Sequence, residues 1–220
     1  MRSSEGARSF ITSLASQLAE KHHVCGPEWL GNEREQKAFK QYAKYILNNL
    51  TSTFKQIAQL TIKDAYHLRP ALGQHGDVGA FWEQHINELF VDWNFTDALT
   101  TIQTGELFRG FFSHPALATI IVEAVWPPTG KLYRSFPSQG ADLDKLIAFS
   151  VTIARWALDS LKAGRQKDFS TAEYRPIFNL ACQRIDNIRD GHYGPTQLLC
   201  LDNLVEDLIA MGTAYHNHYQ

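Results

Sequence analysis

The sequence predicts an all-α fold, a single-domain bundle of about seven or eight helices with one long central helix. Apolar residues recur at steps of three and four along most of the chain, which is the spacing of one helix face. Prolines, glycines and capping residues divide these runs into separate helices. β-branched residues never alternate with polar residues over a useful length, so the sequence predicts no strand.

Length, charge and hydropathy exclude several classes of protein. The 220 residues suit one domain with a substantial core. The formal net charge is −2 and basic residues do not cluster, so we expect no nucleic-acid partner. The longest apolar runs fall far short of the roughly 20 residues that cross a bilayer, so we expect no membrane association. No secretory signal is recognisable, which predicts an intracellular, cytoplasmic protein and leaves a nuclear location open.

Residues 1–31 are predicted to form a separate N-terminal segment, a helix followed by a linker with glycine and proline. The helix is indicated by apolar residues at helical spacing: Phe10, Ile11, Leu14 and Leu18. Gly26-Pro27 and Gly31 then interrupt the pattern. Residues 32–220 form the predicted all-helical domain.

The longest predicted helix opens this domain. Asn32, followed by Glu35, resembles an N-cap with its reciprocal acid. The apolar spacing then continues for about nine turns and ends before Arg69-Pro70, since proline disfavours helical backbone in the residue that precedes it. We expect this helix to be the spine of the fold.

Shorter helices are predicted over residues 81–92, 97–112, 115–126, 142–162, 170–190 and from 195 onward. Pro115 stands at a first helical position after His114, and Pro127 ends that helix. Ser170 and Glu173 have the spacing of a capping box. Residues 127–140 hold three prolines and two glycines, which predicts a loop.

The segment 109–140 contains the candidate ligand-binding residues, which are Arg109, His114, Trp126, Tyr133 and Arg134. Amides just beyond Pro115 lack helical partners and carry the positive end of the helix dipole. Arg109, His114 and Arg134 can add cationic donors. The pattern therefore suits a small anionic ligand or a carboxylate of a partner protein.

A structural interpretation of the same residues is also open. In it, His114 caps its helix, Arg109 pairs with an acid, and Tyr133 and Phe136 fill the core. The residue types favour this interpretation, because aromatic side chains on helices belong more often to the core than to a ligand platform.

No metal site, cofactor or catalytic group is predicted. Two pairs of an acid and a histidine stand three residues apart on predicted helices: Asp64 with His67, and His85 with Glu88. Their order and residue types do not match a metal site of a helical bundle. Cys25, Cys182 and Cys200 match neither a zinc pair nor a disulfide framework and are predicted to be small buried residues. Motifs for nucleophilic catalysis and phosphate binding are absent.

Several segments resemble a known family in order and spacing: "FFSHPALATIIVEAVW", "LYRSFP", "LIAFSVTIARWALDSLKAG", "FSTAEYRPIF" and "QRID". The family is domain of unknown function 6532, which is common in mushroom-forming fungi, the basidiomycetes. The resemblance covers roughly residues 35–190, mostly through core and capping positions. It implies a helical domain in a fungal protein, and it brings no activity, cofactor or catalytic residue.

The leading functional hypothesis is a protein-interaction or small-ligand-binding module, whose partner is an unknown protein or a small anionic ligand. The alternative is an enzyme that acts on a small anionic or polar substrate in a cleft lined by residues 109–140. An enclosed polar pocket that joins Arg109, His114 and Arg134 would favour the enzyme. An open surface with exposed aromatic side chains would favour a module that binds a partner. The sequence does not indicate an oligomeric state.

Overall fold

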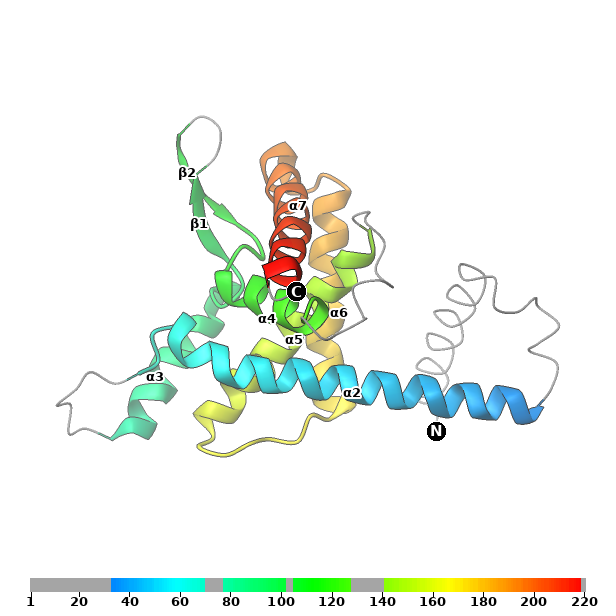
Figure 1. Cartoon of the computed structure of the whole chain (residues 1–220). Coiled ribbons are helices and arrows are strands. Elements are labelled where there is room, and N and C mark those ends of the chain that lie inside the picture. Colours follow the sequence, from blue (N-terminus) through cyan, green and yellow to red (C-terminus); the bar gives the residue numbers. More distant parts are fainter. Residues whose placement is uncertain (1–32, 70–76, 102–104, 128–140, 219–220) are drawn as a thin grey trace. The chain divides into compact units, whose positions relative to one another are not determined.

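The computed structural model of the chain describes residues 33–69, 77–101, 105–127 and 141–218 (Figure 1). The chain divides into two compact units, Met1–Ser52 and Thr53–Gln220, and the boundary lies inside a long helix. The second unit contains both strands and five complete helices of the described residues. The predicted N-terminal helix and linker, residues 1–31, lie outside the described residues.

The described residues contain six α-helices: α2 (Glu33–Ala65), α3 (Val78–Phe90), α4 (Pro115–Val125), α5 (Ala141–Lys162), α6 (Thr171–Arg189) and α7 (Gly194–His218). A short 3-10 helix, η2 (Val91–Trp93), follows α3, and a two-stranded sheet precedes α4. The prediction of a mostly helical fold is confirmed, and α2, with 33 residues, is the longest of the described helices. The expectation of an all-α chain with seven or eight helices is not matched exactly, because one predicted helix is a hairpin and the predicted N-terminal helix lies outside the described residues.

The expected helix over residues 97–112 is wrong, since this part of the chain forms the antiparallel strands β1 (Ala98–Thr101) and β2 (Leu107–Gly110). The register pairs Ala98 with Gly110, Leu99 with Arg109, Thr100 with Phe108 and Thr101 with Leu107. Gly105, in the connection, has a φ of 82°, a left-handed conformation that glycine adopts at little cost and that a helix cannot contain. This turn overrides the helical spacing of the neighbouring apolar residues.

Helix α5 is the centre of the core of the second unit, where it packs against α3, α4 and α6. Its buried apolar residues lie on most sides of the helix: Leu143, Leu146, Ile147, Ala148, Val151, Ile153, Ala154, Trp156, Ala157 and Leu158. Phe149 is half-buried and meets Phe54 of α2 edge-on, with ring centroids 5.1 Å apart. A helix that is apolar on most sides is stable only when neighbours cover it, so α5 depends on the surrounding helices.

The C-terminal part of α2 joins this core through residues that recur every four positions: Phe54, Ala58 and Ile62. The helix ends at Ala65, as predicted, ahead of the proline. His67 has a left-handed φ of 53°, and the amide of Leu68 donates to the carbonyl of Lys63. The helix therefore closes with a left-handed C-terminal turn. The predicted N-cap at Asn32 lies outside the described residues.

Two predicted helix starts are confirmed. Pro115 is the first residue of α4, and the His114 side chain caps this helix by accepting from an amide of its first turn. Ser170 caps α6 by accepting from the amide of Glu173. The Glu173 carboxylate pairs with Lys167, so it does not complete the reciprocal bond of the predicted capping box.

Trp126, one of the candidate binding residues, lies in the contact between α4 and α7. It follows the last residue of α4, is 6% exposed and covers Gly212 of α7. A Cβ atom at Gly212 would stand 2.3 Å from a ring carbon of Trp126, which is closer than real contacts allow. The missing side chain at Gly212 therefore lets the two helices approach each other.

We expect Gly212→Ala to destabilise the protein by about 1–3 kcal/mol, the usual cost of overpacking a core. The added methyl group favours the helix by up to about 1 kcal/mol, so a net loss shows that the clash dominates. Urea denaturation measures the change. In a Trp126→Leu background the same substitution should cost roughly half as much or less, because the obstacle is smaller. An equal cost in both backgrounds would contradict this explanation.

Candidate functional site

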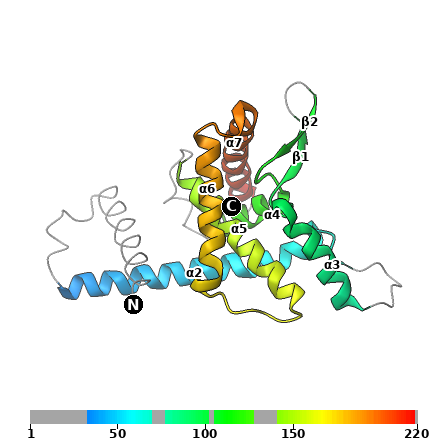
Figure 2. The same ribbon diagram turned by 180° about the vertical axis from the view of Figure 1, so that it is seen from behind.

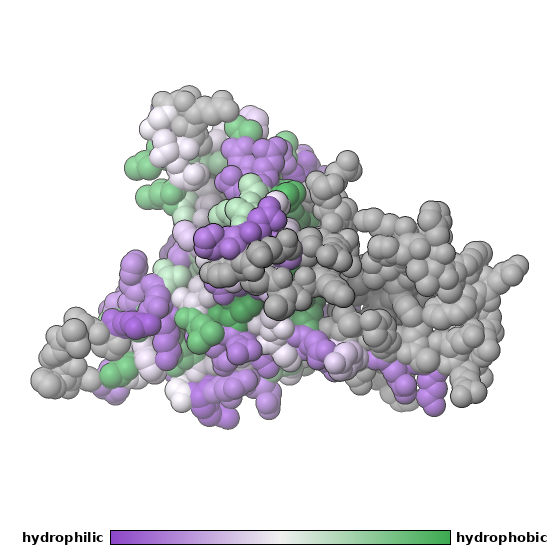
Figure 3. Space-filling view, viewed as in Figure 1, coloured by the Kyte–Doolittle hydropathy of each residue, from purple (hydrophilic) through white to green (hydrophobic). Residues whose placement is uncertain are grey.

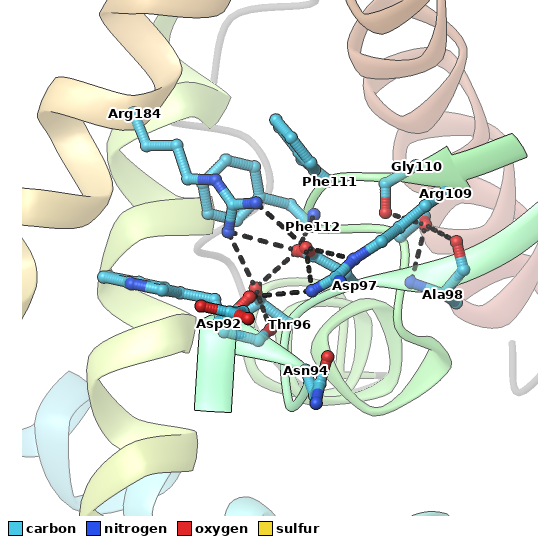
Figure 4. Close-up of polar contacts among 12 residues, drawn as sticks. Asp92, Asn94, Thr96, Asp97, Ala98, Arg109, Gly110, Phe111, Phe112 and Arg184 are labelled. Carbon is cyan, nitrogen blue, oxygen red and sulfur yellow. Dashed lines mark hydrogen bonds and ion pairs between the residues drawn. The ribbon is translucent and has the colours of Figure 1, made fainter. Parts of the chain in front are cut away.

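The candidate site residue Arg109 belongs to a buried ion-pair network around Asp97 (Figure 4). The Asp97 side chain is 1% exposed, and its carboxylate accepts from Nε of Arg109 at 3.1 Å and from Nη2 of Arg184 at 2.9 Å. The hydroxyl of Thr96 and the amide of Phe112 donate to the same carboxylate at 2.7 and 3.3 Å. Two cations and two neutral donors thus stabilise a charge that would otherwise be costly to bury.

The network attaches the hairpin to α6 and α7. The guanidinium of Arg184, on α6, lies over the Phe111 ring, 3.8 Å from its centroid. Gln197, near the start of α7, accepts from the Phe111 amide at 3.2 Å and donates to the Arg109 carbonyl at 2.7 Å. The base of the hairpin is therefore held by contacts from two helices.

Arg109 is already engaged, as the structural interpretation predicts. Besides the ion pair with Asp97, its Nη2 donates to the carbonyl of Asp92 at 2.7 Å. The side chain is 43% exposed, so an external anion can approach it. Such an anion would compete with an internal carboxylate that is already hydrogen-bonded to the same guanidinium.

His114 also takes the structural role. Its Nδ1 accepts from the amide of Ala116 at 3.2 Å, and its ring stacks on Tyr66 with centroids 4.2 Å apart. The next amide, of Leu117, donates to the carbonyl of His114. Burial, with a smaller contribution from His67, lowers the pKa of His114 to about 4. The predictions that the first amides of α4 lack partners and that His114 is cationic at neutral pH are therefore wrong.

The lowered pKa of His114 predicts a loss of stability in mild acid. The unfolded chain takes up a proton at this residue near pH 6.5, whereas the folded protein does so near pH 4. The stability contributed by the neutral ring is therefore present above pH 6.5 and is lost as the pH falls towards 4. We expect this group to account for about 1–2 kcal/mol, allowing for its partial exposure to solvent.

The variant His114→Asn isolates this effect, because asparagine is a good N-cap and does not titrate. The free energy of unfolding would be measured by urea denaturation at about pH 7 and about pH 4.5. We expect the difference between the two values to be smaller in the variant than in the wild type. His192→Asn, at an exposed histidine, is the control. The same pH dependence in all three proteins would rule out the role given to His114.

The described candidate residues do not converge on one site. Arg109 contacts Asp97, His114 stacks on Tyr66, and Trp126 packs between two helices. Tyr133 and Arg134 lie outside the described residues, so a site that includes them stays a prediction.

A groove of about 640 Å³ lies between the hairpin and the helices α4 and α7, three elements that Figures 1 and 2 show from two sides. All four residues of β1 line this groove, and no residue of β2 does. Three of its apolar lining residues are exposed, Leu99 by 71%, Leu199 by 41% and Met211 by 43%. In the space-filling view, hydrophobic residues are visible over the hairpin at the upper left (Figure 3).

The walls of the groove are acidic. Glu123 is the single charged residue of α4, β1 has none, and α7 carries three acids and no lysine or arginine. Glu123 and Asp207 line the groove, and no ion pair of the described residues involves either. Negative walls repel an anion and attract a cationic partner. The groove therefore does not suit the small anionic ligand that the sequence predicts.

The ion-pair network around Asp97 and the groove were not predicted from the sequence, which was interpreted as helical here. Asp97 and Arg184 are 87 residues apart, and nothing in the sequence links an acid to an arginine at that separation. The groove depends on the hairpin. Consecutive β-branched residues at Thr100-Thr101, followed by a turn at Gly105, are the signals that favour strands here.

The sequence also leads to predictions about metal sites, membrane-spanning segments and cysteines. Among the described residues, no group of three histidine, cysteine, aspartate or glutamate side chains could hold a metal ion. In the same part of the chain, no helix is long and apolar enough to cross a membrane. Cys182 and Cys200 are free and only half-buried, so the prediction of buried residues is wrong for them, and Cys25 lies outside the described residues.

Residues 3–188 match the family described as Domain of unknown function (DUF6532). The match extends the resemblance predicted for residues 35–190 towards the N-terminus and ends before α7. It includes β1 and α4, which form two of the three walls of the groove. No curated protein and no solved structure matches the chain.

Proposed function

We propose that this chain, which belongs to the DUF6532 family, is a protein-interaction module that binds a partner in the groove between β1, α4 and α7. The observation that carries this function is the set of exposed apolar side chains of Leu99, Leu199 and Met211 around one groove. Neighbouring apolar side chains that remain exposed on a folded domain are characteristic of interaction sites.

The shape of the groove favours a segment of polypeptide over a small molecule. A small-molecule site buries most of the surface of its ligand. Here the side chain of Leu99 stands 71% exposed at the hairpin wall, so a small ligand would leave much of this apolar surface in water. A longer partner can cover all three walls at once.

The attachment of the hairpin also supports a binding role. The Asp97 network and Gln197 hold the base of β2, and β1 is paired to β2 along its whole length. A wall that is fixed before the partner arrives loses little conformational entropy on binding. The groove therefore has the preorganised character of a recognition surface.

The alternative function, an enzyme acting on a small anionic or polar substrate, needs Arg109 and His114 to be available to that substrate. Arg109 is held by Asp97, and His114 is a neutral helix cap at neutral pH. These contacts support binding over catalysis. We further propose an intracellular, cytoplasmic place of action in a basidiomycete fungus, on the grounds of composition and family resemblance.

Site-specific photo-crosslinking tests the proposed function. A photoreactive amino acid would replace Met211 in the groove or, as the control, Leu180 of α6, which is 52% exposed and does not line the groove. Both proteins would be irradiated in an extract of the cells that make the protein, and adducts would be identified by mass spectrometry. We expect a defined partner to crosslink from position 211 and not from position 180.

The captured partner would then be purified and its binding measured by calorimetry. We expect Leu199→Lys, which puts a positive charge on the apolar wall, to weaken binding at least about tenfold, and Leu180→Lys to leave it unchanged. Equal crosslinking from both positions, or equal affinity of the two charge variants, would overturn the proposed function.

A further inference from the structure

We infer that the occupant of the groove is an extended segment with basic residues, which adds a strand to the outer edge of β1. This inference rests on the proposed function and specifies the partner for the same groove. Three observations carry it: the position of β1, the direction of its backbone groups and the charge of the walls.

The outer edge of β1 borders the groove. Within the described residues, β1 pairs only with β2, so one of its two edges has no strand beside it. All four residues of β1 line the groove and none of β2 does, which places the free edge of β1 on the groove side. Its sequence, Ala98–Thr101, has no proline and no charged residue, two of the means by which an edge is protected from pairing.

The backbone groups of Leu99 and Thr101 face away from β2. The Ser113 hydroxyl accepts from the Ala98 amide at 3.2 Å and lies 3.3 Å from the Ala98 carbonyl. The same hydroxyl lies 2.6 Å from the carbonyl of Gly110, the register partner of Ala98. One hydroxyl reaches both residues only if their backbone groups face each other. Because successive residues of a strand direct these groups to opposite edges, those of Leu99 and Thr101 point outward.

These outward groups favour a strand over a helix as the occupant. A helix uses its own backbone groups internally. If it covered the edge, the amides and carbonyls of Leu99 and Thr101 would be removed from water without partners, which is costly. An extended segment pairs with the same groups and directs alternate side chains onto Leu199 and Met211.

The charge of the walls selects basic residues in that segment. Glu123 on α4 and Asp207 on α7 line the groove, and the walls contain no lysine or arginine. A lysine or arginine of the occupant can pair with either carboxylate. An acidic segment would be repelled from both.

The test uses four short fluorescent peptides of roughly seven residues, the length of an ordinary strand. The first alternates lysine and valine, and the second replaces each lysine by glutamate. The third has lysine and leucine at helical spacing. Fluorescence anisotropy with the full chain gives Kd for each. We expect the basic alternating peptide to bind at least about tenfold more tightly than the acidic and the helical peptides. The fourth, a scrambled basic peptide, controls for charge alone and should also bind more weakly.

Variants of the protein test the charges and the edge separately. Glu123→Gln with Asp207→Asn keeps shape and removes charge, and should weaken the basic peptide about fivefold. Thr101→Pro removes the outward amide, which an edge strand tolerates, and should weaken it by a similar factor. Thr101→Val keeps the amide and is the matched control, with unchanged binding expected. Circular dichroism and thermal unfolding would confirm that each variant is folded.

The failure of this inference can be told apart from the failure of the proposed function. Tighter binding of the helical or the acidic peptide, or unchanged affinity in the Thr101→Pro and carboxylate variants, would overturn the basic strand as occupant. If crosslinking from position 211 still captures a partner, the interaction function stands without it. In a third outcome, the peptides behave as expected, but crosslinking captures the same partner from position 211 and from the control position. The groove would then bind such segments in vitro, and the proposed interaction function would be wrong.

Discussion

Asp97→Ala should lower the free energy of unfolding by about 3–5 kcal/mol, the usual cost of removing one partner from a buried ion pair. The substitution leaves the Arg184 guanidinium, which is 14% exposed, without its carboxylate. It also removes the acceptor of the Phe112 amide, while the Thr96 hydroxyl keeps the Trp93 carbonyl as an alternative acceptor. Urea denaturation, followed by circular dichroism, measures the change. A loss below about 1 kcal/mol would show that the network contributes little to stability.

Two further variants separate burial from charge. Asp202→Ala removes an exposed carboxylate that pairs with Arg189, and we expect a loss of about 0.5 kcal/mol or less. The double variant Asp97→Leu with Arg184→Met replaces the buried charges by apolar side chains. It should recover at least about half of the stability lost by Asp97→Ala, because no uncompensated buried charge remains on α6. No recovery would show that packing around Asp97, and not charge, sets the cost.

Trp156→Ala should destabilise the protein by a similar amount, about 3–5 kcal/mol. Trp156, on α5, is 0% exposed, so removing its ring leaves a large cavity in a packed core. Its indole Nε1 donates to the carbonyl of Lys167 at 2.8 Å, and the ammonium of Lys55 lies 4.5 Å from the ring centroid. The substitution therefore removes apolar packing, a hydrogen bond and a cation–π contact together.

The variant Trp156→Phe controls for the volume of the side chain. It keeps an aromatic ring in the core but leaves the Lys167 carbonyl without its donor, and we expect a loss of about 1–3 kcal/mol. Tyr193→Ala, at an aromatic residue that is 44% exposed, should change stability by less than about 1 kcal/mol. A denaturant midpoint for Trp156→Ala equal to that of Tyr193→Ala would contradict the central place of Trp156 in the core.

The helices could be predicted from the sequence because their causes are local. The start of α4 follows from Pro115, and the start of α6 follows from Ser170, each within one turn of the helix. The burial of α5 follows from apolar residues at most of its buried positions. For these helices, the spacing of apolar residues and the capping residues are enough to predict where each helix lies.

The hairpin and the groove could not be predicted in the same way, because their causes are distant in the chain. Residues 98–110 contain apolar residues at both helical and extended spacings. The left-handed turn at Gly105 favours the hairpin, and the contact of Asp97 with Arg184 then holds it in place. His114 was correctly predicted to precede α4, whereas Arg109 was predicted on a helix and lies on β2. The contacts of Arg109 with Asp97 and of His114 with Tyr66 depend on the folded chain. The groove is formed partly by the hairpin, so the charge and exposure of its walls could not be predicted without predicting the hairpin.

The long separation of the contacts around Asp97 has a consequence for how the chain folds as it is synthesised. Asp97 meets Arg184, and Arg109 meets Gln197, across 87 and 88 residues. A ribosome releases the N-terminal partner of each contact first, so the hairpin emerges before Arg184 and Gln197 are available to contact it. Closing so long a loop is slow compared with forming a helix. We therefore expect the hairpin to attach to the helices only after α6 and the first turn of α7 have been made.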